Sequence, residues 1–396
     1  MGKSHEAVEE ECEVRTFTYA TLPKVCVDWD MRTKKESDAF GNFGHTLANH
    51  SWLRTTDNNA LGAIVQHRLL HSRCTTTDPA RADLFFVPAL LRPKNFREFN
   101  AACAKCNAKV LRAGLPHLNE TTASRHFAVF SKEHFAMKGC DWWYEPTGVF
   151  AQINRVATNA QLPDTPSMHR SVDYMTGWHK ELFDVNNTIF PHFFGTIMPS
   201  NVHIDPHAEY TPPWAMSPKA TGRGSYLMSY LGSTGTYNHG DVAVRAKIQQ
   251  QCKHFGPHVC HVDMYFRVTQ LLIKQRATFC LEAAGDTPFR RSIVDDLTLG
   301  CIPVLFSEAM ETTAPFSWAG WREDSRVHVD RDAFLAGSVN LHELLRNISN
   351  EHVASMQAAI AANGRKFQLS LRDDSGDALG VLLKGIATTR GLLPRS

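Results

Sequence analysis

Two adjacent arginines, Arg290 and Arg291, open a predicted helix directly after a polar turn, Gly285–Thr287. The first turn of a helix presents unpaired N–H groups and a partial positive charge, so it favours phosphate. Arginines at this end oppose the helix dipole and cost stability unless an anion compensates for them. Asp295 lies four residues after Arg291 on the same helical face, where it could reach the ribose of a bound nucleoside diphosphate. The pattern indicates a phosphate site, and its alternative is a plain helix with a surface Arg–Asp pair.

The segments around this turn predict a strand–helix–strand unit. Ala277–Leu281 is a short apolar run typical of a buried strand, and Ile302–Phe306 is a second one. Between them, Thr287 is placed as a helix N-cap with Pro288 after it, and Gly300 is placed as the C-cap. A unit of about thirty residues in this order is what a parallel sheet requires.

Length and charge narrow the class of protein. The 396 residues are enough for two domains with cores of their own. Lys and Arg number 42 against 40 Asp and Glu, and the resulting charge of +2 gives no reason to expect nucleic acid as a partner. The N-terminus is charged and no run of about 18 apolar residues exists, so neither a signal peptide nor a membrane anchor is expected in this chain.

Predicted strands and helices alternate along two stretches, residues 1–212 and 222–396. Between them, Tyr210–Gly224 concentrates Pro, Gly and Ser, which predicts a linker or hinge. Alternation of this kind predicts a Rossmann-like α/β domain on each side of the hinge. The remaining predicted strands are Arg15–Tyr19, Leu84–Val87, His126–Phe130 and Ser225–Tyr230, and the predicted helices are Asn59–Leu70, Phe96–Ala113, Asp241–Cys252 and Tyr265–Lys274.

The run GDTPFRRSIVDDLTLGCIPV, residues 285–304, resembles the donor-binding signature of exostosin-like glycosyltransferases, closest to the plant xyloglucan galactosyltransferase branch. Other stretches agree with that family in order: FTYATLP from Phe17, RADLFFVP from Arg81, RHFAVF from Arg125, and residues 223–232 leading into Arg245 and Cys252. Each outlying motif is weak alone, whereas their order around the central run is fairly specific. The resemblance extends from about residue 16 to about residue 345.

The resemblance implies a GT-B fold, in which two Rossmann-like domains face a central cleft. It implies transfer of a sugar from a nucleotide diphosphate donor, expected to be a UDP-sugar, to a glycan or glycoprotein acceptor. Inversion at the anomeric carbon without a metal or another cofactor is expected, in the Golgi lumen, where family members are normally membrane-anchored. A homodimer or heterodimer is compatible with it. The donor-binding residues that we predict are Gly232, Arg245, Gly285, Asp286, Thr287, Arg290, Arg291 and Asp295.

The glycines Gly232 and Gly235 follow a predicted strand and could bring backbone N–H groups up to a phosphate. Gly pairs also mark plain loops, which is the alternative interpretation. Neither a GxGxxG pattern nor a Walker A motif is present here, since Gly240 is followed by Asp241. This disfavours a dinucleotide oxidoreductase and a P-loop NTPase.

An inverting transfer needs a base beside the acceptor hydroxyl. We predict His126, Asp205 and Glu209 as candidates for that base. The family usually has an Asp before the histidine, whereas this chain has Arg125. That departure supports the alternative of a catalytically inactive exostosin-like subunit that binds nucleotide or glycan.

Three further motifs have competing interpretations. Asp28-x-Asp30 resembles a metal-binding DxD motif but lies outside any nucleotide-binding unit, so we interpret it as surface loop. The alternating residues of 203–207, HIDPH, could present metal ligands from a strand, but the proline interrupts it and disfavours a metal. The aromatic run of residues 142–144, WWY, could stack on sugars or divide between core and surface.

Ten cysteines fit either redox compartment. Cys103 and Cys106 could form a disulfide or half of a metal site, or be helical neighbours, and the absence of a second CxxC disfavours metal. Cys252 and Cys260 flank a Gly-Pro turn and are a plausible disulfide of a luminal protein. N-x-S/T sequons, which lean toward the same compartment, begin at Asn49, Asn119, Asn186 and Asn347.

Overall fold

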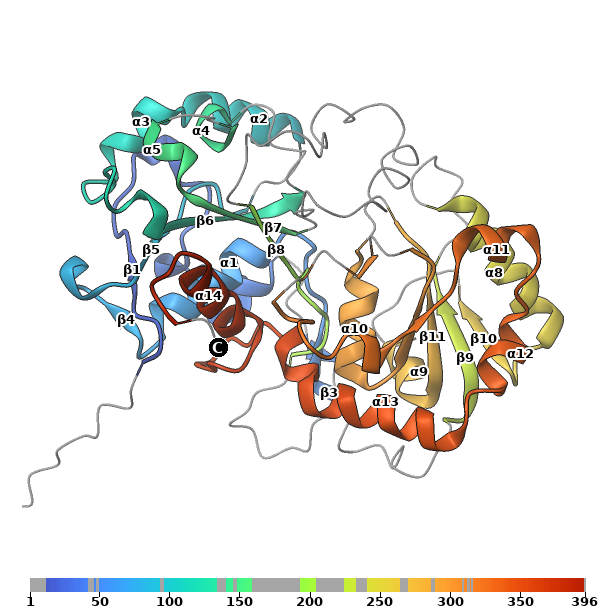
Figure 1. The fold of residues 1–396 in the computed structure, drawn as a ribbon. Coiled ribbons are helices and arrows are strands. Elements are labelled where there is room, and N and C mark those ends of the chain that lie inside the picture. The colour runs from blue at the N-terminus through green and yellow to red at the C-terminus, as the bar shows by residue number, and fades with distance from the viewer. Residues whose placement is uncertain are drawn as a thin grey trace, which may run out of the picture.

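Two α/β units, each built on its own parallel sheet, form the molecule (Figure 1). The computed structural model describes residues 12–41, 46–47, 50–92, 96–133, 140–144, 148–158, 193–203, 224–232, 241–263, 270–285, 289–307, 310–311, 314 and 316–394. The first unit contains most of the chain up to residue 203, and the second contains most of the chain from residue 224 to residue 363. The predicted class, two Rossmann-like units as in a GT-B fold, is confirmed.

The first sheet has the strand order β4-β1-β5-β6-β7-β8, and every pair in it is parallel. Its strands are β1 Thr16–Thr18, β4 Thr75–Thr76, β5 Leu84–Val87, β6 His126–Glu133, β7 Asn154–Thr158 and β8 Phe193–Thr196. Its helices are α1 Leu61–Leu70, α2 Phe96–Lys105, α3 Ala108–Ala113, α4 Asp141–Tyr144 and α5 Gly148–Ala151. A small antiparallel pair, β2 Thr46–Leu47 and β3 His50–Arg54, lies outside this sheet.

The second sheet has the order β10-β9-β11-β12-β13, again with parallel neighbours. Its strands are β9 Tyr226–Leu231, β10 Cys260–Asp263, β11 Ala277–Glu282, β12 Ile302–Leu305 and β13 Val327–His328. Its helices are α8 Val242–Phe255, α9 Leu271–Arg276, α10 Arg291–Leu299, α11 Arg331–Ala336, α12 Leu341–Arg346 and α13 Asn350–Asn363, and α14 Ala378–Thr389 follows them in the chain. Short 3-10 helices cover Lys24–Cys26, Met31–Thr33, Glu36–Phe40, Pro79–Arg81, Ala123–Arg125, Glu323–Ser325 and Gly364–Phe367.

The apolar runs form central strands because helices cover both faces of a parallel sheet. Every residue of β5 and of β11 is buried. The predicted strand–helix–strand unit is present as β11, α10 and β12, and Gly300 closes α10 in the left-handed conformation with φ 73°.

Several predicted helix boundaries are wrong; helix α8, for example, ends at Phe255 and not at Cys252. Helix α10 begins at Arg291 with Arg290 as its N-cap, later than predicted, while Thr287 and Pro288 lie outside the described residues. The single helix predicted over Phe96–Ala113 is divided into α2 and α3, because the Asn107 side chain accepts from the Val110 N–H (3.0 Å) and caps a new helix.

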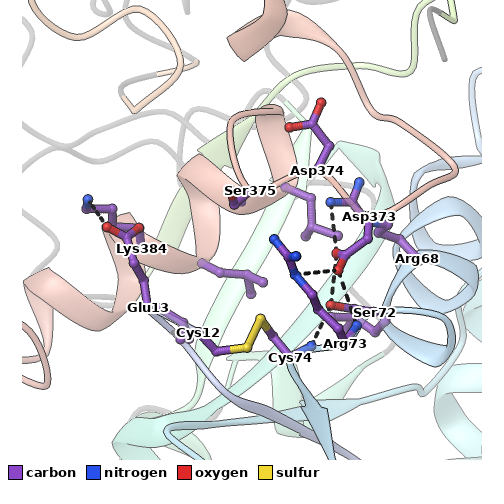
Figure 2. Close-up of a pocket in the computed structure, with 15 residues that line it drawn as sticks. Cys12, Glu13, Arg68, Ser72, Arg73, Cys74, Asp373, Asp374, Ser375 and Lys384 are labelled. Carbon is purple, nitrogen blue, oxygen red and sulfur yellow. Dashed lines mark hydrogen bonds and ion pairs between the residues drawn. A yellow bond between two sulfur atoms is a disulfide. The ribbon is translucent and has the colours of Figure 1, made fainter. Parts of the chain in front are cut away.

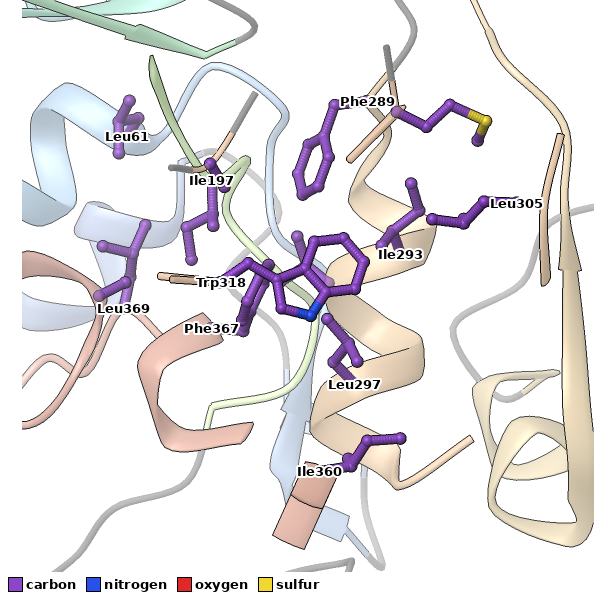
Figure 3. Close-up of a cluster of buried hydrophobic side chains, with 14 of the residues drawn as sticks. Leu61, Ile197, Phe289, Ile293, Leu297, Leu305, Trp318, Ile360, Phe367 and Leu369 are labelled. Carbon is purple, nitrogen blue, oxygen red and sulfur yellow. The ribbon is translucent and has the colours of Figure 1, made fainter. Parts of the chain in front are cut away.

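A shared hydrophobic core joins the two units. Figure 3 shows Trp318 packed between two groups of side chains. Ile293 and Leu297 of α10 lie on one side, and Phe367 lies on the other, with Ile197 of the first unit nearby. Apolar burial is the main favourable term in such packing. The arrangement of the units is therefore held by side chains from both.

The chain returns to the first unit after α13. Helix α14, predicted in the second domain, packs against β8 and lies beside α1 in Figure 1. Arg68 of α1 donates from Nη1 to Asp377 Oδ2 (2.7 Å) and to Ser370 O (3.3 Å). The predicted boundary between residues 212 and 222 lies outside the described residues, so it stays a prediction.

A small pocket of about 110 Å³ lies between this C-terminal segment and the first unit (Figure 2). The Cys12–Cys74 disulfide lies in its wall. Its charged side chains pair with one another: Asp373 lies 3.4 Å from both Arg68 and Arg73, and Lys384 lies 2.8 Å from Glu13. These pairs attach the C-terminal segment rather than marking a binding site.

Every cysteine is paired. The disulfides are Cys12–Cys74, Cys26–Cys106, Cys103–Cys140, Cys252–Cys260 and Cys280–Cys301. The predicted Cys252–Cys260 bond is confirmed, whereas Cys103 and Cys106 pair with other partners, which leaves no thiolate for a metal. Five disulfides indicate that the chain folds in an oxidising compartment.

No helix in the ranges given above is long and apolar enough to span a bilayer.

The Arg68–Asp377 pair yields a stability prediction. Burial raises the pKa of Asp377 to about 6, although Arg68 opposes the rise. Replacing Arg68 with Met leaves a buried carboxylate without its cation and should cost about 3–5 kcal/mol of unfolding free energy at pH 7.5. Because the folded pKa is raised, the carboxylate is destabilising above it and is neutralised by protonation below it. The deficit should therefore shrink between pH 7.5 and pH 5 in urea titrations.

The matched control is Arg73→Met, since the Arg73 side chain is 56 % exposed in its pair with Asp373. An exposed pair is worth about 0–1 kcal/mol. Equal losses in the two variants at pH 7.5 would contradict the assigned role of the buried pair.

Candidate active site

The second sheet reverses its strand order between β9 and β11. Strand β10 lies on one side of β9 and β11 lies on the other. In open α/β sheets, ligands bind in the crevice outside the carboxyl ends of the strands at this reversal. Gly232 follows β9 there, and the residues from Ala283 to Arg290 follow β11.

Two arginines flank Gly285 at this edge. Arg245 of α8 donates from Nε and Nη2 to Ala284 O (3.1 and 2.9 Å), and Arg290 donates from Nη1 to Ala283 O (3.3 Å). A Cβ on Gly285 would lie 3.0 Å from Arg290 Nε and 3.4 Å from Arg245 Nη2. A glycine here therefore lets both guanidinium groups come close to the same stretch of backbone.

Tyr230, at the end of β9, completes this group, and sequence reasoning missed it. Burial raises the pKa of its hydroxyl, while the charges of Arg245 and Arg290 oppose the rise. The same hydroxyl lies 2.9 Å from the position of a Cβ on Gly232. The structure thus brings together four predicted donor residues, Gly232, Arg245, Gly285 and Arg290, around one tyrosine.

A buried ionic network lies beneath the turn, and it too was missed. Glu282, at the carboxyl end of β11, accepts from Lys274 Nζ (3.0 Å) and from the Ser292 hydroxyl. Lys274 also contacts Asp296 and donates to Ser292 O (3.0 Å). Burial opposes ionisation of Glu282, but Lys274 and Arg290 lower its pKa below the ordinary value. Glu282 is therefore an anion that ties β11 to the first turn of α10.

Arg291 and Asp295 face the first unit instead of the crevice. Arg291 Nη1 donates to Thr56 O (2.7 Å). The carboxylate of Asp295, a residue 1 % exposed, accepts from the Ser200 hydroxyl (2.5 Å) and the Asn201 N–H (3.1 Å). We predicted that these two side chains contact the donor nucleotide. In the structure they contact residues of the first unit instead.

His126 does not fit a catalytic base. It begins β6, so it lies at the amino end of a parallel strand, and it is fully buried. Its Nε2 lies 2.7 Å from the Tyr19 hydroxyl, its Nδ1 lies 2.8 Å from Thr122 O, and its ring stacks on Phe85. Burial lowers its pKa to about 4. The prediction is corrected accordingly: His126 is a neutral core residue whose two ring nitrogens both have partners.

The other base candidates, Asp205 and Glu209, and the donor residues Asp286 and Thr287 lie outside the described residues, so their roles stay predictions. Residues 205–207 of the disfavoured metal motif lie there as well. Its first residue, His203, bonds through Nε2 with the Thr56 hydroxyl (2.8 Å).

The remaining motifs are structural. Asp28 is exposed and Asp30 accepts from the Arg32 N–H (3.0 Å), as expected of a surface loop. Trp142 and Trp143 are buried against Phe130, which confirms the core interpretation for both.

A metal centre is not evident in the part of the chain that the structure describes. Cys280, Asp296 and Cys301 approach one another closely enough to hold an ion, but the two sulfurs are bonded to each other. A disulfide offers no thiolate ligand.

Two doubly wound units, with a cationic glycine turn at the strand reversal of the second, define a GT-B-type α/β protein. The Exostosin GT47 domain profile matches residues 15–333. The chain belongs to that family.

Among curated relatives from Arabidopsis thaliana, the probable xyloglucan galactosyltransferase GT13 is 29 % identical over 33 % of this chain and 30 % of its own length. The probable xyloglucan galactosyltransferase GT17 is 26 % identical over 85 % of this chain and 72 % of its own. The xyloglucan-specific galacturonosyltransferase 1 is 24 % identical over 78 % and 45 %. For GT13, and for the similar GT15 and GT12, the match spans only about a third of the relative's length.

A solved structure of the pneumococcal O-GlcNAc transferase GtfA, in complex with UDP and GlcNAc, covers 75 % of this chain and 60 % of that one, at 10 % identity and a TM-score of 0.33. The likeness is too slight to support an inference.

The glycine turn yields a prediction for the site. Gly285→Ala places a methyl group against the Arg290 and Arg245 side chains, which must give way by a few tenths of an ångström. We expect UDP affinity to fall by roughly tenfold or more through the loss of a charge-assisted hydrogen bond, with little change in melting temperature. Calorimetric titration with UDP and a thermal melt provide the two measurements.

The control is Gly376→Ala, because its Cβ would also meet an arginine, Arg365, but at 3.5 Å and away from the turn. Unchanged UDP binding in Gly285→Ala would place the nucleotide elsewhere.

A second prediction concerns His126. The pKa of His126 is lower in the folded chain than in the unfolded chain, so unfolding takes up a proton below pH 6.5. The stability that the neutral histidine contributes is therefore present above pH 6.5 and is lost as the pH falls toward 4. Replacing it with Phe should make the unfolding free energy less steep in pH between 6.5 and 5, by at most about 1.4 kcal/mol per pH unit. The matched control is His352→Gln, because His352 is exposed. Equal slopes for wild type and His126→Phe would contradict a neutral buried histidine.

Proposed function

We propose that the chain is a glycosyltransferase that transfers a sugar from a nucleoside diphosphate donor, a UDP-sugar, to a glycan or glycoprotein acceptor. The observation that carries the proposal is the grouping of Arg245, Arg290 and Gly285 at the strand reversal of the second sheet. Membership of the Exostosin GT47 domain family agrees with it. The names of the plant relatives, galactosyl- and galacturonosyltransferases, indicate the class of sugar to test first.

The diphosphate would lie against the turn after β11, with its charge opposite Arg245 and Arg290. Departure of a diphosphate leaves negative charge that grows in the transition state, and pre-oriented guanidinium groups stabilise such charge. Arginine suits this role because its planar fork matches phosphate oxygens and stays protonated. Two arginines can supply this stabilisation without a metal, and we propose transfer with inversion and without a divalent ion.

The acceptor would approach from the first unit, over the carboxyl ends of its parallel strands. We retain Asp205 and Glu209 as candidates for the base that removes the acceptor proton, and discard His126 because it lies at the opposite end of the sheet. The five disulfides support an oxidising compartment such as the Golgi lumen as the place of action.

The inactive-subunit alternative loses its main support. It depended on Arg125, and that side chain donates from Nε to Asp83 O (2.9 Å) and lies over the ring of Phe85, beside His126. Arg125 lies at the amino end of the first sheet. Its presence therefore does not affect the turn after β11, which we call the donor turn.

The test is a screen of UDP-sugars for binding and for release of UDP, with and without EDTA, in the presence of glycan acceptors. Arg290→Ala should weaken UDP binding by roughly ten- to a hundredfold, the range expected when a charge-assisted hydrogen bond is lost. The control is Arg322→Ala, at a half-buried arginine that pairs with Glu323 and Glu311. EDTA-resistant release of UDP would support metal independence.

Each other result has a defined meaning. Binding without release, over a panel of acceptors, would favour the inactive subunit. Loss of activity in EDTA that added Mn²⁺ restores would overturn the metal-independent proposal alone. The absence of UDP binding would remove the donor assignment altogether.

A further inference from the structure

We infer that Arg291 and Asp295 are positioning residues that fix the donor helix α10 to the acceptor-side unit and thereby set the geometry of sugar transfer. This inference rests on the proposed function. It assigns to the two side chains a role different from the nucleotide contact that their sequence context predicts.

The two residues lie four apart on α10, so they share one face of the helix. Arg291 Nη1 reaches the carbonyl oxygen of Thr56 at 2.7 Å. Asp295 Oδ1 accepts from the Ser200 hydroxyl at 2.5 Å and from the Asn201 N–H at 3.1 Å, and its Oδ2 lies 3.4 Å from Asn201 Nδ2. Three segments that are distant in sequence therefore meet on this face.

The contacts form a closed ring. The Thr56 N–H donates to Asn201 Oδ1 at 3.1 Å, so the path runs from Arg291 to Thr56, on to Asn201 and Asp295, and back along one helical turn. We call these four residues the clamp. Nearby, β3 pairs with residues 201–203 through Arg54 N to Asn201 O (2.9 Å) and His203 N to Trp52 O (2.8 Å).

Apolar clusters border the clamp and shield it from solvent. Trp52 and Leu53 of β3 and Val202 pack with Leu271 of α9 and Leu299 of α10, so this cluster contains residues of both units. The core shown in Figure 3 also borders α10, because Ile293 and Leu297 belong to the same apolar cluster as Ile197 of the first unit, with Trp318 drawn between them. Thr56, Asn201 and Asp295 are each at most 4 % exposed.

In this buried position, the loss of a hydrogen-bond partner is strongly destabilising. A buried polar group left without its hydrogen bond keeps its desolvation cost, and that cost is larger if the group is charged. The clamp is satisfied only when α10 and the first unit keep their present register. It therefore specifies their relative position more sharply than apolar contacts alone, which tolerate small shifts.

That position matters because the next residue is Arg290. In one turn of α10, Arg290 lies at Gly285 and Arg291 lies at Thr56, so the donor turn and the acceptor-side unit are joined by adjacent residues. A displacement of about 1 Å between reacting groups can cost about a hundredfold in rate. Weakening the clamp should therefore reduce transfer to the acceptor more than it reduces binding of the nucleotide.

The chain supplies a matched pair of variants. Asp295 and Asp296 are adjacent buried aspartates on one helix, but Asp295 faces the first unit and Asp296 faces Lys274 in its own unit. Asp295→Asn turns an amide N–H₂ toward Asn201 Nδ2 and removes the carboxyl group beside Arg291. Asp296→Asn makes the same chemical change on the other side of the helix.

Hydrogen exchange gives a readout that does not depend on activity. In Asp295→Asn, the amides of Thr56 and Asn201 should exchange at least tenfold faster than in wild type. In Asp296→Asn, both amides should keep wild-type protection even if the melting temperature falls.

Kinetics give the second readout. Asp295→Asn and Arg291→Met should each lower kcat for transfer by roughly ten- to a hundredfold, keep the Kd for UDP within about twofold, and raise the ratio of donor hydrolysis to transfer. Arg291→Lys, which keeps one donor for Thr56 O, should recover part of the transfer rate.

The outcomes separate the two proposals. If Asp295→Asn or Arg291→Met weakens UDP binding as much as Arg290→Ala does, these residues contact the donor and the inference is wrong. Unchanged exchange of the Thr56 and Asn201 amides in Asp295→Asn would overturn it as well. If wild type binds no UDP, the proposed function fails, while the exchange experiment still tests the clamp.

Discussion

The first turn of α10 carries two guanidinium groups at the positive end of its own helix dipole, and much of the structure compensates for that electrostatic conflict. Arg290 is balanced by the Ala283 carbonyl and the charge of Glu282, and Arg291 by the Thr56 carbonyl and the charge of Asp295. One arginine is directed to the donor turn, and the other is used to join the units.

Local patterns predicted the elements around this helix well. A four-residue apolar run, LFFV, became β5 without a shift, and Gly300 took the left-handed C-cap position that only a glycine adopts at low cost. The Cys252–Cys260 bond was also foreseeable, because the two cysteines are separated by only eight positions in the sequence. These features depend on neighbours within a few residues.

The candidate site was predicted only in part, because its remaining contacts are long-range. A spacing of four shows that Arg291 and Asp295 share a face of the helix. It does not show that this face contacts Thr56, 235 positions away from Arg291, and Ser200, 95 positions away from Asp295. His126 has a catalytic residue type, yet its partner Tyr19 is 107 residues distant and lies in the core. Tyr230 and Glu282 gave one weak signal, a polar residue at the end of a buried strand, which has no meaning until the sheet order is known.

The return of the C-terminal helix to the first unit has a consequence for how the chain is made. Leu379, Leu382 and Ile386 of α14 are buried, and their partners in the first unit are synthesised long before them. At a translation rate of about 5–20 residues per second, the interval between residue 203 and this helix lasts roughly ten to thirty-five seconds. During that time the first unit is incomplete and exposes the apolar surface that α14 later covers. The second unit can therefore form most of its own sheet before the first unit is complete, although it lies later in the sequence.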